Sequence, residues 1–235
     1  MEHQHTAIDG STVTIDAAVD PQRQASSVGV YAVDGRWQEL TTSYLEFGRD
    51  VALDLGVELT ESYRYQGGTL LIGTTSVAFA HEGGQPPQND LLHLAVWEGR
   101  EHSVHTHLYN GRAHDLIAAL DRFTIDEHAA GVRLLPRDPG RTRLAQEPSV
   151  LREVPSVGLL HIRPMTRKVA RMVPSWKGAS ARGGELFVGR RPGSLHMVLA
   201  GRRSHTLIMR EGEECSKEDL SRVMLLDVDW RTPSS

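Results

Sequence analysis

A chain of 235 residues and 26.0 kDa is long enough to bury a substantial core, as one large domain or two small ones. Its composition, 39% hydrophobic and 24% charged residues, excludes a disordered protein. No apolar run reaches the roughly 18 residues of a membrane-spanning helix. The single cysteine, Cys215, excludes a disulfide framework, and the first residues lack the pattern of a secretory signal. We therefore expect a cytoplasmic protein with no membrane partner.

Charge is distributed unevenly along the chain. Residues 1–130 contain 7 Arg/Lys and 19 Asp/Glu, which gives −12. Residues 131–210 contain 16 Arg/Lys and 4 Asp/Glu, which gives +12, and the remaining residues, 211–235, carry −4. Blocks of opposite sign point to an anionic partner for the basic block. The alternative is that the acidic and basic blocks neutralise each other within one fold.

The N-terminal part, residues 1–59, predicts strands followed by a helix. Two β-branched runs, 11–15 and 28–33, predict strands, and the Asp-Gly pair after the second run favours a tight hairpin. Apolar residues then recur every three or four positions, which predicts an amphipathic helix over about 37–56. Gly48 should weaken the centre of this helix by roughly 1 kcal/mol relative to alanine.

Residues 60–136 predict an acidic β-β-β-α unit, which opens with a Gly-Gly pair before its first strand. The β-branched and apolar runs are separated by a turn-rich loop over 81–90 and by a tight connection at 98–100. The expected strands cover 69–75, 77–80, 91–97 and 103–109, and the expected helix covers 113–123.

Residues 137–175 predict a basic, proline-rich linker or binding arm. Six of the eleven prolines and eight Arg/Lys residues fall between positions 136 and 174. Proline at this spacing argues against a long helix and against a central strand, because it lacks the backbone N–H that both need. An ordinary packed segment is the alternative. The last expected domain, residues 176–235, contains a basic ribbon and a C-terminal helix.

Two segments of the chain resemble each other. The residues from Gly67 to Gly73 resemble those from Gly183 to Gly189, 116 positions later, and His93 matches His196, 103 positions later. The order of elements also agrees, so we expect two copies of a β-β-β-α unit in the second and fourth domains. Chance similarity between two short hairpin segments is the alternative. The predicted fold class is α+β, mainly antiparallel sheet with a few amphipathic helices.

The basic block predicts a surface that binds an anionic partner. Arginine dominates it, and the planar guanidinium suits carboxylate and phosphate groups. Its glycines let backbone amides approach a phosphate, and Trp176 can stack on a base. The residues that we expect to form this surface are Arg163, Arg167, Lys168, Arg171, Trp176, Lys177, Arg182, Arg190, Arg191, Arg202 and Arg203.

A histidine cluster predicts a second kind of site. On a strand, His105 and His107 lie on one face, roughly 7 Å apart, which is a common start for a zinc, iron or copper site. His114 or Asp115 is the expected third ligand. The alternative is an exposed strand with polar residues on its solvent face.

The spacing from Gly99 to His105 and His107 resembles the first motif of the cupins, a glycine, five residues and His-x-His. The resemblance covers about ten residues and would imply a metal site. Gly111 and Arg112 stand where the motif's glutamate is expected, and the second cupin motif has no match, so we do not assign the chain to that family.

Two functions follow from these patterns. The preferred one is a non-catalytic binding or assembly protein that uses the basic 137–210 surface and needs no cofactor. Its partner would be an acidic protein face, a second copy of the chain, or nucleic acid bound without sequence specificity. The alternative is an enzyme that depends on a divalent transition metal, with its site on the histidine strand 102–114. No P-loop, nucleophile elbow or His-Glu-x-x-His motif is present.

Overall fold

The computed structural model describes residues 1–19, 25–79, 88–191, 194–211 and 216–233. Contacts divide the chain into two compact units: unit 1 comprises Met1–Val28 and Glu147–Ser235, and unit 2 comprises Gly29–Gln146. Both units are built mainly of antiparallel strands with short helices, so the predicted α+β, mainly antiparallel class is confirmed. In the described part of the chain, no helix has the length and apolarity needed to cross a bilayer.

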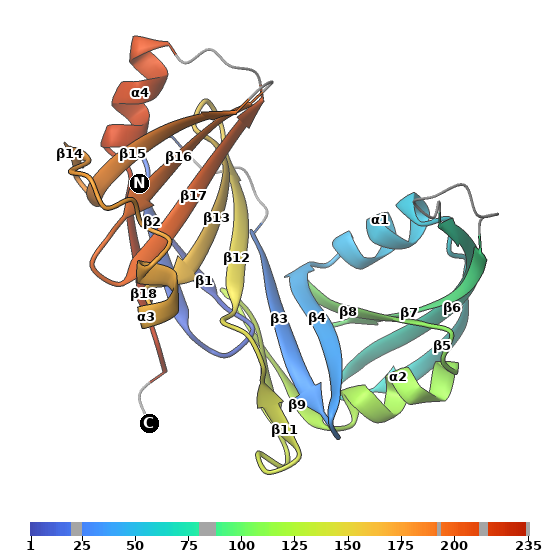
Figure 1. The fold of residues 1–235 in the computed structure, drawn as a ribbon. Coiled ribbons are helices and arrows are strands. Elements are labelled where there is room, and N and C mark those ends of the chain that lie inside the picture. Colours follow the sequence, from blue (N-terminus) through green and yellow to red (C-terminus); the bar gives the residue numbers. More distant parts are fainter. Residues whose placement is uncertain (20–24, 80–87, 192–193, 212–215, 234–235) are drawn as a thin grey trace. The chain divides into compact units, whose positions relative to one another are not determined.

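Unit 2 contains a sheet in the order β3-β4-β8-β7-β6-β5, with β11 paired to β3 and with a separate β9–β10 hairpin (Figure 1). Its elements are β3 (Ala25–Val33, which begins in unit 1), β4 (Arg36–Tyr44), α1 (Phe47–Asp54), β5 (Leu59–Tyr65), β6 (Gly68–Phe79), β7 (Gln88–Glu98), β8 (His102–Tyr109), α2 (Ala113–Leu120), β9 (Phe123–His128), β10 (Gly131–Pro136) and β11 (Thr142–Leu144).

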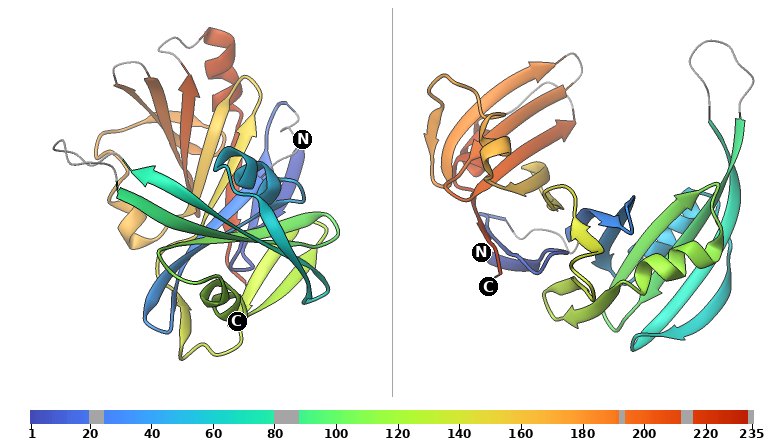
Figure 2. Two further views of the ribbon diagram at one scale, coloured as in Figure 1. Left: turned by 90° about the vertical axis from the view of Figure 1, so that its right-hand side faces the viewer. Right: turned by 60° about the horizontal axis from the view of Figure 1, so that its bottom comes forward.

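Helices cover both faces of the unit 2 sheet. Figure 1 shows α1 and α2 on opposite faces, and α2 lies along its face in the right-hand view of Figure 2. Residues 92–97 of β7 are buried without interruption, because alternate side chains point to the two covered faces. Leu92, Leu94 and Val96 pack with Ala52 of α1 in one hydrophobic cluster.

Unit 1 contains a sheet in the order β14-β15-β16-β17-β13-β12-β3 and a second group of strands in which β2 pairs with both β1 and β18. Its further elements are β1 (Glu2–Thr6), β2 (Thr12–Asp16), β12 (Ser149–Val154), β13 (Gly158–Pro164), α3 (Arg167–Ala170), β14 (Ala179–Ala181), β15 (Gly184–Arg191), β16 (Ser194–Ala200), β17 (Ser204–Glu211), α4 (Lys217–Met224) and β18 (Asp227–Arg231).

The core of unit 1 lies between this sheet and the strands β2 and β18. Leu160, Ile162 and Ile208 of the sheet belong to one buried cluster with Ile15 of β2 and Val223 of α4. We call the sheet face that packs on this cluster the inner face, and the opposite one the outer face.

The segment expected to form a helix over 37–56 forms a strand and a shorter helix. Its first part is β4, which pairs with β8 from Leu40 to Tyr44, and only residues 47–54 are helical. Leu40 is fully buried whereas Trp37 is exposed, so these two apolar residues do not share a helical face. Pairing with a neighbouring strand overrides a local spacing pattern in this segment.

Residues 137–175, expected to be extended or irregular, also contain interior strands. Both β12 and β13 have a neighbouring strand on each side. Pro148 precedes β12, Pro155 follows it and Pro164 ends β13, so none of these prolines interrupts the interior of a strand. Residues 165–178 contain no strand. Most of the expected 81–90 loop, residues 80–87, lies outside the described residues.

The two units share one order of elements. The series β-β-α-β-β-β-β-α-β runs from β3 to β9 and again from β12 to β18, and in both the connection after the second strand has 14 residues. The register corrects the predicted residue match, however. Gly73 pairs with Leu94, and Gly189 pairs with His196. When Gly73 is aligned with Gly189, His196 therefore corresponds to Leu94, 102 positions earlier, and not to His93, 103 positions earlier. The shift of one residue places His93 and His196 on opposite sheet faces, so they are not equivalent.

Candidate partner-binding surface

The connection between β13 and β14, residues 165–178, carries four of the ten basic residues predicted for binding, and we call it the basic arm. Thr166 caps α3, because its side chain accepts a hydrogen bond from the Val169 N–H at 3.2 Å. Val169 is buried and anchors this turn. At the other end, a Cβ on Gly178 would lie 2.9 Å from the Leu186 carbonyl oxygen and 3.0 Å from the ring of Phe187, so the arm lies close against β15.

Several cations on or beside the arm have no carboxylate partner within the described residues. The arm begins next to the β16–β17 turn, where the Met165 N–H donates to the Arg203 carbonyl at 2.9 Å. Lys168 of the arm has a partner, Glu147, at 3.7 Å, and at this exposed position the pair contributes little. The exposed and unmatched cations are Arg167, Arg171, Lys177 and, in the turn, Arg202.

Other predicted surface residues are neutralised inside unit 1. Arg182 pairs with Asp16 at 2.5 Å, and the Nε–H of Arg203 donates to Asp229 at 2.6 Å. Counted by unit, unit 1 holds 16 Arg/Lys and 14 Asp/Glu and unit 2 holds 10 and 16, which gives net charges of +2 and −6. The contrast along the sequence is therefore much smaller between the folded units, because acidic residues from both chain ends belong to unit 1.

Arg190 and Arg191 belong to β15, but their side chains lie outside the described part of the structure, as does Cys215. Arg163 is half-buried on the outer face, opposite His205. Its Nε–H donates to Nε2 of His161 at 3.1 Å. Burial, together with the charges of Arg163 and His205, lowers the pKa of His161 to about 4. This cluster therefore holds neutral imidazoles around one guanidinium.

The basic arm also exposes large apolar side chains. Met172 is 57% exposed and Trp176 is 65% exposed, although the indole packs in a T-shaped arrangement with the ring of Phe187 at a centroid distance of 6.3 Å. In the 14-residue connection of unit 2, by contrast, Ala52 and Val57 are buried. One surface of unit 1 thus combines unmatched positive charge with exposed apolar groups.

Comparison with known proteins gives no information about the function of this surface. No family model, curated protein or solved structure matches the chain. Function is therefore inferred from the arrangement of this chain's own side chains.

Among the described residues, the three histidines predicted as metal ligands do not form one group, because only His105 and His107 share a sheet face. His105 lies under α1, with its ring 5.5 Å from that of Phe47, and His107 follows on the same face. His114 is exposed on α2, which covers the opposite face, and it pairs with Asp115 at 3.3 Å. Among the residues that the structure describes, no group of three or more His, Cys, Asp or Glu side chains is arranged to hold a metal ion.

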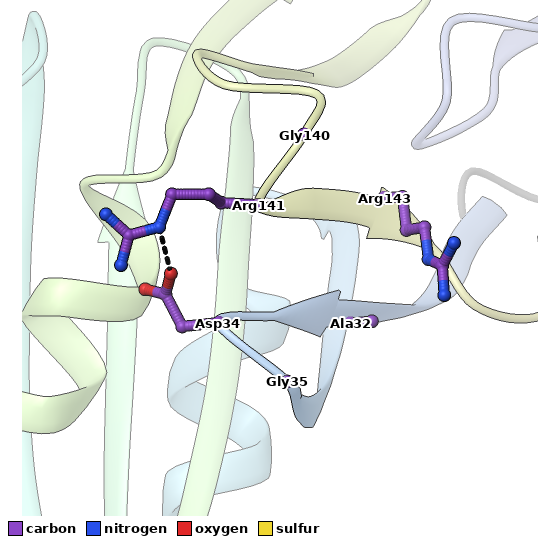
Figure 3. Close-up of a pocket in the computed structure, with 6 residues that line it drawn as sticks. All are labelled: Ala32, Asp34, Gly35, Gly140, Arg141 and Arg143. Carbon is purple, nitrogen blue, oxygen red and sulfur yellow. Dashed lines mark ion pairs between the residues drawn. The ribbon is translucent and has the colours of Figure 1, made fainter.

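Unit 2 has a basic pocket of its own, of about 520 Å³, at the β3–β4 turn and β11. Figure 3 shows Arg141 directed at Asp34, with Nε 2.7 Å from Oδ1, and Arg143 directed away from this pair. Arg122 also contacts Asp34, at 2.6 Å. The carboxylate therefore already neutralises part of the pocket's charge, which leaves Arg143 as its exposed cation without a carboxylate partner in the described residues.

The sequence prediction included the cations of the arm and Trp176 but not the other exposed apolar residues nearby. Met172 was not singled out, nor was Leu159 of β13, which is 39% exposed on the outer face. A signal for β13 is present, because Leu160 and Ile162 alternate with Leu159, His161 and Arg163. The prolines on either side of this alternation obscured it.

Proposed function

We propose that this chain is a non-catalytic binding protein that holds an acidic protein partner on the basic arm of unit 1. The observation that carries the proposal is the set of four cations without carboxylate partners in the described residues beside exposed Met172 and Trp176. Cations that are not neutralised internally attract an anionic partner and speed its association. Exposed methionine and tryptophan favour a protein partner, because such residues are enriched in the buried parts of protein interfaces.

The test compares two anionic polymers on the full chain. Fluorescently labelled polyglutamate and a labelled 20-nucleotide single-stranded DNA are titrated at 50 and 300 mM NaCl, and anisotropy reports binding. We expect polyglutamate to bind more tightly than the DNA, with weaker binding at the higher salt concentration. Tighter binding of the DNA would identify nucleic acid, and not a protein, as the partner. If neither polymer binds, the proposal is overturned.

A pair of triple variants locates the binding surface. We expect Arg167→Gln, Arg171→Gln and Lys177→Gln together to weaken polyglutamate binding at least tenfold. The matched control replaces Arg36, Arg64 and Arg143, three exposed arginines of unit 2, with glutamine. It removes the same charge and should change the affinity less than twofold. A larger loss in the control than in the arm variant would assign binding to unit 2.

Light scattering after size-exclusion chromatography at both salt concentrations tests the remaining partner. A monomer at both concentrations fits a different protein as the partner. A dimer at low salt that the arm variant abolishes would instead identify a second copy of the chain as the acidic partner, because unit 2 carries −6.

We also propose that the two units arose by duplication of one β-β-α-β-β-β-β-α-β unit, which contains the predicted β-β-β-α segment. The shared element order and the two 14-residue connections support this. Superposition of the two sheets in an experimental structure, with Gly73 on Gly189, tests the idea, and a failure of β7 to fall on β16 would contradict it.

A further inference from the structure

The outer face of the unit 1 sheet continues the apolar surface of the arm. Val198 of β16 pairs with Leu207 of β17, and Met209 of β17 pairs with Leu159 of β13. Residues directly opposite each other in an antiparallel ladder share a sheet face. All four side chains lie on the outer face, because their neighbours Leu199, Ile208 and Leu160 point into the core. None of the four is fully buried.

This face ends in a groove of about 450 Å³, lined by Leu159 and Met209 together with the β12–β13 turn. Glu153 and Arg210 also contribute to the lining. Arg210 already donates to Asp219 at 3.0 Å and to the Ser156 carbonyl at 2.9 Å. The groove therefore combines the apolar side chains of Leu159 and Met209 with polar groups.

In unit 2 the corresponding face is covered by a helix. The register places Val96 at the position of Val198 and His105 at that of Leu207. In unit 2, α1 lies over this face, with Phe47 against His105 and Ala52 in the cluster that contains Val96. The arm of unit 1 has the same length, but only four of its residues form a helix, and Pro174 lies where a longer helix would continue.

The charges around the face define what can cover it. Residues 154–184 contain no Asp or Glu, and they include the unmatched cations Arg167, Arg171 and Lys177. Glu153, which pairs with Leu159 on the same face, is among the described residues the one carboxylate that lines the groove. The helix that covers the unit 2 face carries two exposed carboxylates, Asp50 and Asp54. A helix with an apolar stripe and flanking carboxylates would therefore match both the apolar side chains of the unit 1 face and the cations of the arm.

We propose that the outer face of the unit 1 sheet, between the basic arm and the β12–β13 turn, binds an acidic amphipathic helix of a protein partner. This inference rests on the proposed function and specifies how the partner binds. The apolar stripe of the helix packs on Val198, Leu207, Met209 and Leu159. Its carboxylates lie toward the cations of the arm, and Trp176 and Met172 cover one side of it.

The test uses three synthetic peptides of 18 residues on the full ¹⁵N-labelled chain. One has leucines spaced three and four apart and glutamates elsewhere, the second is a scrambled sequence of the same composition, and the third has lysine in place of glutamate. We expect the first to bind at least tenfold more tightly than the others, with amide shifts in β13, β16 and β17, and its helical circular dichroism to rise on binding.

Two variants separate apolar from charged contacts. Leu159→Gln should weaken binding of the first peptide at least tenfold, whereas Leu53→Gln, at a 78% exposed position on α1, should leave it unchanged. Equal binding of the first and scrambled peptides to the unmodified chain would overturn the helix inference and leave the proposed function standing, whether or not the variants fold. A lack of binding to both acidic peptides and to polyglutamate would overturn both.

Discussion

Gly48 of α1 lies so close to Val96 of β7 that no larger residue fits between them. A Cβ built on Gly48 would lie 2.3 Å from Cγ1 and 3.3 Å from Cγ2 of Val96. The sequence predicted this glycine to be a weak point of the helix. The structure gives it a different role, because the missing side chain lets α1 approach the sheet and cover its face.

Gly48→Ala is therefore expected to destabilise unit 2, although alanine favours a helix by roughly 1 kcal/mol over glycine. Overpacking against Val96 costs roughly 1–3 kcal/mol, which exceeds that gain. Hydrogen exchange of the β7 amides in urea measures the change. Leu53→Ala, on the exposed side of the same helix, should alter exchange little. If the β7 amides exchange more slowly in Gly48→Ala than in the parent chain, the close contact between Gly48 and Val96 is contradicted.

Glu127 of β9 holds the β7–β8 turn through its carboxylate. The backbone N–H groups of Arg100, Glu101 and His102 donate to it at 2.8–3.0 Å. Burial raises the pKa of Glu127, but these hydrogen bonds outweigh that effect and lower it below the usual value. The carboxylate therefore contributes stability that is complete above about pH 4.5 and is lost as pH falls through the folded pKa.

We expect Glu127→Gln to cost roughly 1–3 kcal/mol at pH 7, because the neutral amide leaves a backbone donor without its charged acceptor. The variant should also lose this part of the acid sensitivity of unit 2. Thermal unfolding between pH 3 and 7 measures both effects. Glu58→Gln, at an exposed position, is the control, and equal Tm profiles for the two variants would contradict the role of Glu127.

His105 is expected to make unit 2 sensitive to acid. Burial beneath α1, together with the charge of His107, lowers its pKa from 6.5 to about 4. The unfolded chain therefore binds a proton that the folded chain rejects, so stability falls as pH drops from 6.5 toward 4, by up to about 1.4 kcal/mol per pH unit. Above pH 6.5 the contribution is constant.

His105→Leu should remove this dependence without loss of stability at pH 7. In the proposed duplication, Leu207 of unit 1 corresponds to His105. Nδ1 of His105 is buried with no hydrogen-bond partner within the described residues. Urea unfolding at pH 5 and pH 7.5 tests this, with the 64% exposed His114→Leu as the control. An unchanged pH slope in His105→Leu would refute the prediction.

Ser27 joins two distant segments of unit 1 through one buried hydroxyl. The group accepts a hydrogen bond from the Ile8 N–H at 2.9 Å and donates to the Ser149 carbonyl at 3.1 Å. Ser27→Ala leaves both backbone groups without this partner and is expected to cost roughly 1–3 kcal/mol. The midpoint of thermal unfolding measures the loss. Exposed Ser175→Ala should not lower it, and a comparable drop in both variants would rule out a specific role for Ser27.

The sequence predicted those elements in which the spacing of apolar residues matches the way the element packs in the fold. The apolar run of β7, the alternation in β8 and the helix at Ala113 were all expected close to where they lie. Local spacing misled at 37–44, where the strand is defined by pairing with β8, whose residues lie about 60 positions away. No local pattern carries that information.

The candidate surface could be predicted only in part for a similar reason. Arginine density correctly identified Arg167 and Arg171 as exposed. The partners that neutralise Arg182 and Arg203, however, lie 166 and 26 positions away in the chain. The order of the strands in the sheet decides which cations have no carboxylate partner. A count of charges along the sequence does not contain this information.

The pairing of β2 with β18 has a consequence for how the protein is made. The ribosome completes unit 2 while only the first strands of unit 1 have been synthesised, because residues 29–146 form one continuous unit and unit 1 is interrupted by it. Thr14 pairs with Asp229 in the ladder, so this pair can form only after residue 229 has been synthesised. Closing so long a loop is entropically costly and slow, so we expect the pairing of β2 with β18 to be a late step in folding.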